Sequence, residues 1–508
     1  MQNKVLFATT ILQGLALSCV GGDEQIDNLE IPQDDDYVEE QKDELDEPDD
    51  SGDSDEPTVK VSGKGMNVLF MVVDDLSDAL GCYGHSIVKT PNIDKLAQSG
   101  VQFNKAYCNF PVSGPSRASF LTGLRPESIG VLANTTMLST VIGDRVSLPY
   151  LYKLNGYRTV NLNKIFHQPN NQAYGDEKAW SDYYEFSTTS LGSSGTSRNM
   201  TADIAAANDD VDELSWCKWL MANGGDEDQV DGQVAAKAID VILEDSDEPF
   251  FLGVGWAKPH DPYWAPAEYF DLYPLSECEP HQVPDGYEAP NVRTFPAYTE
   301  TTFTKFTDND KREYLRSYYA CISFMDAQVG KVMDALEESG KADNTIIIFF
   351  SDHGYHLGEH NHWGKFTVLE RGSRVPFIMA GATIPESSRG TVCDSYIELL
   401  DIYPTLAELS ELEESVPADL EGVSYTQLLD DPEAQTKTNS QTIILRNKIG
   451  RSIVNDQWRY VEWDDNGVAE YRELYNVQDD YFEYVNLSAD DNYSSIISQM
   501  SSLLTRPY

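Results

Sequence analysis

The chain has 508 residues, of which 41% are hydrophobic and 11% aromatic, so it can build a large core and is not wholly disordered. Its 85 acidic residues outnumber 36 basic ones and give a formal net charge of −49. This charge argues against a nucleic-acid binder, because phosphate contacts need a basic surface. An anionic substrate would have to bind in a locally positive pocket.

The N-terminus has the pattern of an export signal. Lys4 precedes a mostly apolar stretch at residues 5–17, and Cys19 follows the small residue Ser18. The stretch has the length of a signal-peptide core and is too short to span a membrane. We expect residues 1–19 to be a signal peptide with a lipoprotein-type Cys19, which anchors the protein in the periplasm or on the surface of a Gram-negative bacterium. Ordinary secretion with an incidental cysteine is the alternative, and no later run predicts a transmembrane helix.

Residues 20–63 form an acidic segment. Between residues 23 and 56 there are 18 Asp or Glu residues, one Lys and few apolar side chains. This composition predicts a disordered linker, extended by the repulsion of like charges. It either holds the folded part away from a membrane or serves as a solubilising tail.

Four apolar runs predict strands that are buried on both faces, as in a parallel sheet. They are residues 67–73, 157–162, 250–255 and 345–350. Polar side chains follow each run within a few residues: Asp74 and Asp75, Lys164 and His167, Lys258 and His260, and Asp352 and His353. Because open α/β sheets bind ligands outside the carboxyl ends of their strands, we expect these groups to share one site.

Helical patterns lie between the predicted strands, at residues 92–99, 310–339 and 395–412, the last interrupted by Pro404. The sequence therefore predicts a doubly wound α/β domain, with a mostly parallel sheet and helices on both faces, over residues 64–435. A small antiparallel C-terminal subdomain follows at residues 436–508, with strands at 442–445 and 452–463 separated at Gly450.

Two acidic pairs indicate a metal site. Adjacent carboxylates such as Asp74 and Asp75 repel each other unless a positive group lies between them, and a hard divalent cation would serve. Asp352 and His353 end another predicted strand and can reach the same ion. A solvated turn is the alternative for either pair taken alone.

The run Ser-Gly-Pro-Ser-Arg at residues 113–117 predicts a helix start, with Ser113 just before it and Pro115 in the first turn. The N–H groups of a helix N-terminus favour an anion, and Arg117 could hold an oxyanion through two donors. A serine turn that only caps a helix is the alternative.

Together these motifs resemble the sulfatase family of the alkaline-phosphatase superfamily. The family signature is Cys or Ser, any residue, then Pro-Ser-Arg, and residues 113–117 match it. The resemblance covers residues 66–410 and is closest to the iduronate-2-sulfatase-like branch. That branch has lysine and histidine loops that look like residues 164–167 and 258–260, and a metal-binding strand that looks like residues 351–360, with Lys365 after it.

The resemblance implies that a maturation enzyme oxidises Ser113 to formylglycine, whose hydrated aldehyde attacks sulfur and later releases sulfate. It implies one Ca²⁺ ion, held by Asp74, Asp75, the modified Ser113, Asp352 and His353. It implies that Arg117 stabilises the hydrate, that Lys164 and Lys365 bind sulfate, and that His167 and His260 transfer protons, with His260 as the acid to the leaving alcohol. Two features depart from the common pattern: Ser replaces Cys at residue 113, and His replaces Asn at residue 353.

The substrate expected on this basis is a sulfated oligo- or polysaccharide, such as the marine algal polysaccharide ulvan. A glycosaminoglycan uronate 2-sulfate is the second candidate. A phosphodiesterase or phosphonate hydrolase of the same superfamily, and a glycan-binding lipoprotein with an inactive site, remain alternatives. The six cysteines after Cys19 permit disulfides without indicating a pairing. His356, His360 and His362 either contact substrate or shape their loop.

Overall fold

The computed structural model describes residues 65–169, 171–209, 211, 213–287, 294–465 and 468–505. The predicted signal peptide, Cys19 and the acidic linker lie outside these residues. All six cysteines after Cys19 are described, and each is a free thiol. Among the residues described, no helix has both the length and the apolar character needed to cross a membrane.

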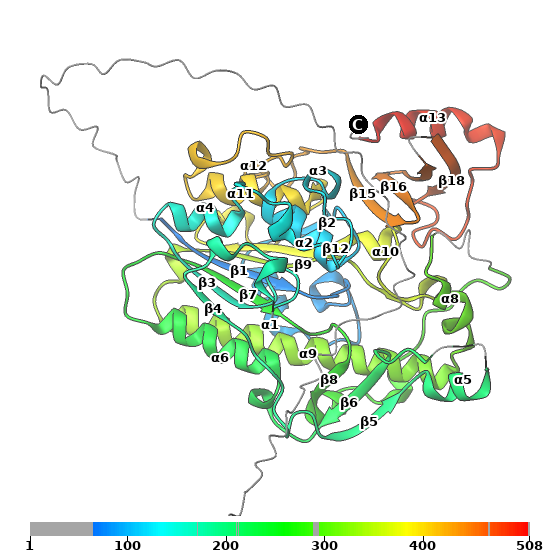
Figure 1. Ribbon diagram of the computed structural model, residues 1–508, viewed down its shortest axis with the longest axis horizontal. Helices are drawn as coiled ribbons and strands as arrows, with labels where there is room; N and C mark the ends of the chain where they lie inside the picture. The colour runs from blue at the N-terminus through cyan, green and yellow to red at the C-terminus, as the bar shows by residue number, and fades with distance from the viewer. Residues whose placement is uncertain are drawn as a thin grey trace, which may run out of the picture. The chain divides into compact units, whose positions relative to one another are not determined.

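The core of the fold is the predicted large sheet, with strand order β13-β2-β12-β9-β1-β7-β3-β4, and β14 beside β2 (Figure 1). The strands are β1 (Asn67–Val73), β2 (Val101–Tyr107), β3 (Arg158–Asn163), β4 (Asp182–Tyr184), β7 (Phe250–Trp256), β9 (Thr345–Ser351), β12 (Arg374–Gly381), β13 (Thr391–Cys393) and β14 (Ile397–Glu398). β12 runs antiparallel to β2 and β9, while the other pairings in this sheet are parallel.

The register of the central strands brings their carboxyl ends together. Val73, the last residue of β1, pairs with Trp256 of β7 and with Ser351 of β9. The residues that follow these three strands therefore emerge at one edge of the sheet. This alignment places Asp74 next to Asp352 although they are far apart in the chain.

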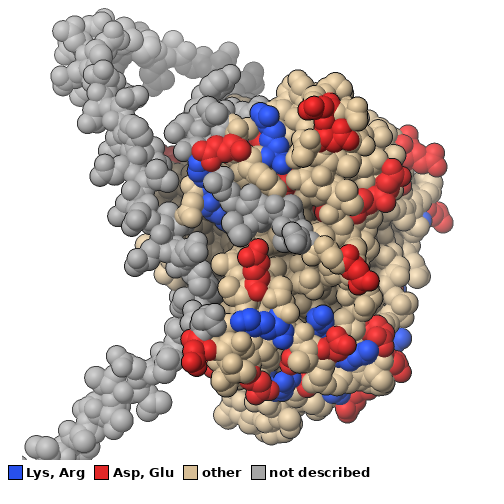
Figure 2. Space-filling view, turned by 90° about the vertical axis from the view of Figure 1, so that its right-hand side faces the viewer, with Lys and Arg blue, Asp and Glu red and all other residues tan. Residues whose placement is uncertain are grey.

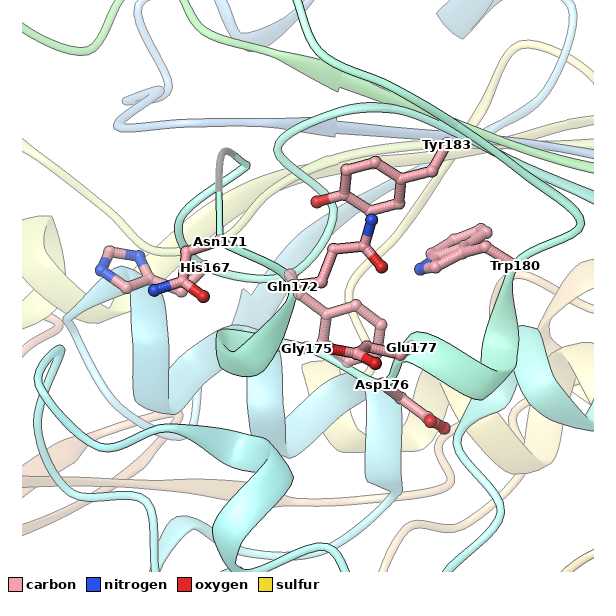
Figure 3. Close-up of a pocket in the computed structure, with 9 residues that line it drawn as sticks. His167, Asn171, Gln172, Gly175, Asp176, Glu177, Trp180 and Tyr183 are labelled. Atoms are coloured by element: carbon pink, nitrogen blue, oxygen red, sulfur yellow. The ribbon is translucent and has the colours of Figure 1, made fainter. Parts of the chain in front are cut away.

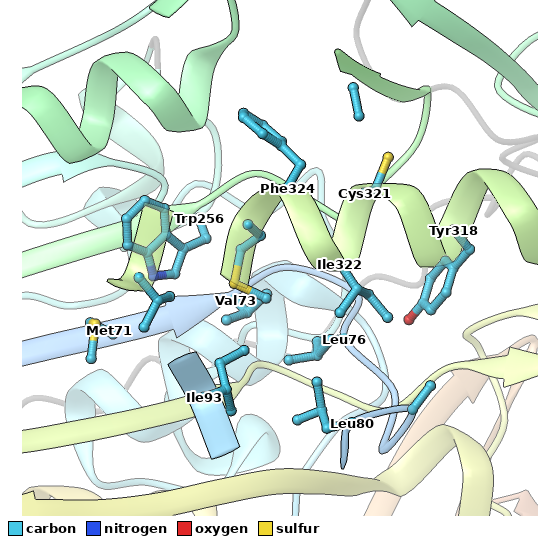
Figure 4. Close-up of a cluster of buried hydrophobic side chains, with 14 of the residues drawn as sticks. Met71, Val73, Leu76, Leu80, Ile93, Trp256, Tyr318, Cys321, Ile322 and Phe324 are labelled. Atoms are coloured by element: carbon cyan, nitrogen blue, oxygen red, sulfur yellow. The ribbon is translucent and has the colours of Figure 1, made fainter. Parts of the chain in front are cut away.

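Helices cover both faces of the sheet, because β1 is apolar from Val68 to Val73 and alternate residues of a strand face opposite sides. Leu69, Met71 and Val73 pack with α1 (Pro91–Gln98), α6 (Val230–Leu243) and α9 (Asp308–Glu338). Figure 4 shows part of this cluster, with Ile322 of α9 pointing toward Leu76 just after the end of β1. Val68, Phe70 and Val72 pack on the other face with α2 (Ser113–Thr122), α4 (Leu148–Leu154) and α11 (Ile402–Leu409). The fold is thus doubly wound, as predicted.

The helix predicted at residues 395–412 is shorter than expected. Residues 397 and 398 form strand β14, and the α-helix proper begins at Ile402. Pro404 lies in the first turn of α11, where its missing N–H costs no hydrogen bond, so it starts the helix and does not interrupt it.

The C-terminal region is an antiparallel sheet of β15 (Asn439–Arg446), β16 (Lys448–Asn455), β17 (Trp458–Asp465) and β18 (Val468–Asn476), followed by α13 (Ser494–Leu503). The single strand predicted at 452–463 was wrong, because a turn divides it between β16 and β17. Gly450 lies inside β16 and does not separate two strands. A side chain there would collide with the Trp463 ring, so glycine is needed for packing on the neighbouring strand.

A third, small sheet contains β5 (Gly195–Asn199), β6 (Lys218–Ala222) and β8 (Tyr263–Pro266). It is built partly from the polar tract at residues 199–231, which contributes β6. β8 follows the loop that carries His260, and it pairs with β6. Through this pairing, the polar tract supports the loop after β7 that carries His260.

Candidate active site

The four residues of the predicted metal site meet at the carboxyl ends of β1 and β9. Asp74, Asp75, Asp352 and His353 are buried, and one ligand atom from each lies within 4.8 Å of the others. The backbone N–H of Asp75 donates to Oδ1 of Asp352, 3.3 Å away. Asp75 has a left-handed backbone conformation with φ 63°, which turns the chain sharply after the strand.

This cluster fits a metal ion. Its carboxylate oxygens are ligands that hard divalent cations prefer, and Oδ2 of Asp75 is buried without a hydrogen-bond partner among the described residues. Burial lowers the pKa of His353, which favours the neutral imidazole that metal coordination requires. The ring Nδ1 donates to the carbonyl of Gly354 at 3.0 Å, so Nε2 is the atom available to the cluster.

Ser113 lies against the same cluster. Its hydroxyl donates to Oδ1 of Asp74 at 3.1 Å, and Oγ is 3.1 Å from Nε2 of His353 and 3.5 Å from Nζ of Lys365. Ser113 is the first residue of α2, one position further into the helix than the sequence suggested. The side chain is therefore held both by the start of a helix and by the ends of two strands.

Arg117 is fully buried one turn further along α2. Its Nε donates to Oδ2 of Asp352 at 2.8 Å, and its second guanidinium arm donates to the carbonyls of Lys164 and Ile165. The remaining nitrogen lies 3.5 Å from Oδ1 of Asp74. Arg117 thus ties the helix that carries Ser113 to the loop after β3.

Two lysines form ion pairs with the carboxylates of the cluster. Nζ of Lys164 is 2.5 Å from Oδ2 of Asp74, and Nζ of Lys365 is 2.7 Å from Oδ1 of Asp75. Burial alone would raise the pKa of Asp74, but Lys164, then His260 and other cations, outweigh it and lower that pKa well below its usual range. Asp74 therefore stays ionised at neutral pH.

The two candidate proton-transfer histidines have opposite electrostatic environments. Burial opposes protonation of His260, but Asp261, Asp75 and Asp74 outweigh it and raise its pKa to about 10. Its Nδ1–H donates to the carbonyl of Asp261 at 2.7 Å, and Nε2 lies 3.8 Å from Oδ2 of Asp75. His260 is therefore a proton donor at neutral pH, and Nε2 is the atom that can deliver the proton.

His167 is neutral instead. Burial, followed by the charge of Lys164, lowers its pKa well below the usual range. It lines a small pocket formed by the loop after β3, and Figure 3 shows Gln172, Trp180 and Tyr183 grouped on the opposite side. The pocket volume is about 10 Å³, which is room for one water molecule and not for a sugar.

Comparison with known proteins identifies the family. A model described as "Sulfatase" matches residues 66–412, and one described as "N-sulphoglucosamine sulphohydrolase, C-terminal" matches residues 358–507. The chain belongs to the sulfatase family. It is accordingly a sulfuric ester hydrolase.

Two relatives and one solved structure show what this sulfatase is similar to. A "Sulfatase" of Formosa agariphila is 31% identical over 87% of this chain and 86% of its own length. The "Iduronate 2-sulfatase" of Homo sapiens is 31% identical over 68% and 69%. Among solved structures, the phosphonate monoester hydrolase of Agrobacterium radiobacter has a TM-score of 0.70 at 22% identity, over 86% of this chain and 94% of its own. At that identity the likeness concerns the fold alone.

The sequence did not reveal Asp231 as part of the sulfatase site. This residue lies in an acidic tract, yet it is buried at the start of α6. Its two oxygens accept the backbone N–H groups of Ala257 and Lys258 at 2.8 and 2.9 Å. The ammonium of Lys258 donates to the carbonyls of His260 and Pro262. Asp231 and Lys258 thus shape the loop that carries His260, and no local pattern marks this role.

Proposed function

We propose that this sulfatase removes sulfate from a sulfated carbohydrate by means of a formylglycine made from Ser113. The observation that carries the proposal is the position of the Ser113 hydroxyl, within 3.5 Å of Asp74, His353 and Lys365. The hydrated aldehyde supplies one hydroxyl to attack sulfur and a second to expel sulfate afterwards. A maturation enzyme that accepts serine is required for this modification.

Calcium is the proposed cofactor, with Asp74, Asp75, Asp352, His353 and the modified Ser113 as its ligands. When bound, the ion lowers the pKa of the nucleophile and polarises the sulfate group. The three carboxylates of the cluster are already balanced by Lys164, Lys365 and Arg117, so a bound dication would leave a net positive site for an anionic substrate.

That local charge matters because the chain as a whole carries −49. On the face in Figure 2, Lys and Arg side chains form small groups beside Asp and Glu, and no broad basic surface is visible. The local charge of the active site is therefore the feature that would attract a sulfated polyanion. Salt weakens the repulsion from the surface, since charges are screened within about 8 Å at physiological ionic strength.

The remaining residues have distinct proposed roles. Lys164 and Lys365 hold sulfate oxygens and stabilise the charge that develops on them. Arg117 holds Asp352 and the hydrate of the nucleophile. The raised pKa of His260 supports it as the acid that gives its Nε2 proton to the departing alcohol, whereas the neutral His167 can only accept a proton or a hydrogen bond.

Mass spectrometry of the peptide that contains Ser113 tests the proposal. In active enzyme, the side chain should have lost two hydrogen atoms relative to serine. Ser113→Ala should release no sulfate, whereas Ser113→Cys should stay active in a host whose maturation enzyme accepts both residues. Active enzyme with an unmodified Ser113 would contradict the proposal.

The proposed substrate is a marine algal polysaccharide such as ulvan, which suits an exported, strongly acidic enzyme in salty surroundings. An iduronate 2-sulfate in a glycosaminoglycan fragment is the second candidate, supported by 31–32% identity to two iduronate 2-sulfatases. Sulfate release from a panel of defined sulfated oligosaccharides separates the two. A phosphonate monoester in the same panel tests the phosphonate hydrolase alternative, and faster turnover of that ester would favour it.

Export and lipid attachment at Cys19 are part of the proposal. Fractionation of cells that express the full chain would test them. Cys19→Ala should move the protein from the membrane fraction to the soluble fraction without changing sulfate release. Membrane association that persists in this variant would refute the anchor.

A further inference from the structure

Lys365 lies in a loop with little regular structure. The loop begins with a two-residue strand pair, β10 (His356–Leu357) and β11 (Trp363–Gly364). Between and after these strands the backbone is left-handed at Gly358, His360 and Phe366, with φ values of 112°, 58° and 73°. Backbone hydrogen bonds hold the turn at residues 358–362 and the N–H of Phe366, which donates to the carbonyl of Pro111, whereas the carbonyl of Lys365 is bonded by a side chain.

His362 supplies one such bond to Lys365. Its Nε2 lies 2.7 Å from the backbone carbonyl of Lys365, and its Nδ1 lies 2.8 Å from the hydroxyl of Thr299 in α8 (Ala297–Thr301). A carbonyl can only accept, so Nε2 carries the proton, and the Thr299 hydroxyl must donate to Nδ1. The carbonyl of Lys365 thereby fixes the tautomer, and Thr299 holds the orientation of the ring through its other nitrogen.

The surroundings of His362 keep this bond in place. The side chain is fully buried, and the ring of Tyr298 lies nearly parallel to it at 6.1 Å. Burial lowers the pKa of His362 to about 3, so the ring stays neutral at any pH where the enzyme is folded and active. The imidazole acts as a fixed hydrogen-bond donor and not as an acid.

We infer that Thr299 and His362 form a positioning relay that sets the backbone of Lys365 and so aims its ammonium at the sulfate group. The inference rests on the proposed role of Lys365 in sulfate binding. Nζ of Lys365 is 2.7 Å from Asp75 and 3.5 Å from Ser113. A displacement of about 1 Å at a reacting centre can cost on the order of a hundredfold in rate, so a rigid backbone anchor matters.

His356 shows what a purely structural histidine looks like in the same loop. It is equally buried, and its Nε2 contacts the hydroxyl of Thr367 at 2.6 Å. The structure has no hydrogen bond from its side chain to the backbone of Lys365. His356→Leu is therefore a matched control for the loss of a buried imidazole.

A double-mutant cycle tests the relay. His362→Leu should lower kcat about tenfold in the wild-type background and change it less than about twofold in a Lys365→Ala background, because the effect passes through Lys365. His356→Leu should cause a similar loss of thermal stability but the same small change of kcat in both backgrounds. Circular dichroism and thermal unfolding confirm that each variant is folded.

A second set of variants keeps the test decisive if His362→Leu does not fold. Thr299→Val retains the ring but removes the hydroxyl that holds its orientation, so kcat should fall severalfold with KM nearly unchanged, while Thr299→Ser should match wild type. His362→Gln should recover most of the activity lost in His362→Leu, because its side-chain amide can donate to the same carbonyl.

The outcomes separate the relay from the proposed function. If Lys365→Ala stays within about twofold of wild type, the proposed role of Lys365 fails and the relay fails with it. If Lys365→Ala is strongly impaired but His362→Leu, or Thr299→Val in its place, has the same effect in both backgrounds, only the relay is overturned. Equal activity of Thr299→Val and Thr299→Ser would overturn it as well.

Discussion

The two sides of the active site are held in different ways. Asp74 and Asp352 continue the hydrogen bonding of the central sheet, since their N–H groups donate to the carbonyls of Trp256 and Val73. Lys365 instead lies in an irregular loop, in which the side chains of His362 and Arg446 donate to the backbone carbonyls of Lys365 and Phe366. The side proposed to bind the metal therefore depends on the sheet, whereas the lysine proposed to bind sulfate depends on tertiary contacts. Substitutions should have different consequences on the two sides.

The largest expected effect is on the metal-binding side. Asp74→Ala and Asp352→Ala should each lower kcat/KM by at least about a thousandfold, because losing a ligand costs several kcal/mol of charge stabilisation. Turnover and Ca²⁺ binding, by calorimetry, are the measurements. Asp343→Ala, which changes an exposed carboxylate just before the opposite end of β9, is the control. A variant that kept both activity and metal would show that the ligand set is wrong.

On the loop side, Lys365→Ala should lower kcat by about 10²–10³, the range for a charge contact made in the transition state. Uniform binding of substrate and transition state would appear in KM instead. Lys95→Ala, at an exposed lysine paired with Glu337, should leave both constants unchanged. Kinetics within twofold of wild type would remove Lys365 from the site and weaken the role proposed for Lys164.

The pH dependence of kcat/KM tests the proposed role of His260 as the acid. Burial lowers its pKa, but Asp261, Asp75 and Asp74 outweigh it and raise the pKa to about 10. The acid is present below this pKa, so kcat/KM should fall as the pH rises through it, and a bound cation would move this limb of the profile to lower pH. Asp261→Asn removes one of the raising charges, so the alkaline limb should shift about one pH unit further down. An unchanged limb would mean that another group is the acid.

The last expected effect is on stability, at a buried carboxyl group of the C-terminal sheet. Burial raises the pKa of Glu473 in β18 from 4.5 to about 7. The folded protein holds this proton more tightly than the unfolded chain, so the contribution is complete below about pH 4.5 and is lost as the pH rises through 7. Glu473→Gln should therefore recover about 3 kcal/mol at pH 8 without affecting turnover. Thermal unfolding at pH 5 and pH 8 measures it, and equal pH dependence in both proteins would contradict the assignment.

The amino-acid sequence by itself determined the class of fold and most of the site. Continuous apolar runs predict strands of a parallel sheet, and such strands end at one edge, so Asp74 and Asp352 could be expected to meet. The run at residues 113–117 predicted the helix start that holds Ser113. These features were predictable because local hydrogen bonding and hydrophobic periodicity place them.

Only the tertiary structure decided the rest. The burial of Asp231, the contrast between His260 and His167, and the link from Thr299 through His362 to Lys365 all depend on which distant segments pack together. A carboxylate that becomes buried cannot be told from an exposed one in the sequence, because its pKa and its hydrogen bonds depend on the residues that surround it in the fold. The electrostatics of a buried site arise from contacts between segments that the chain itself keeps far apart.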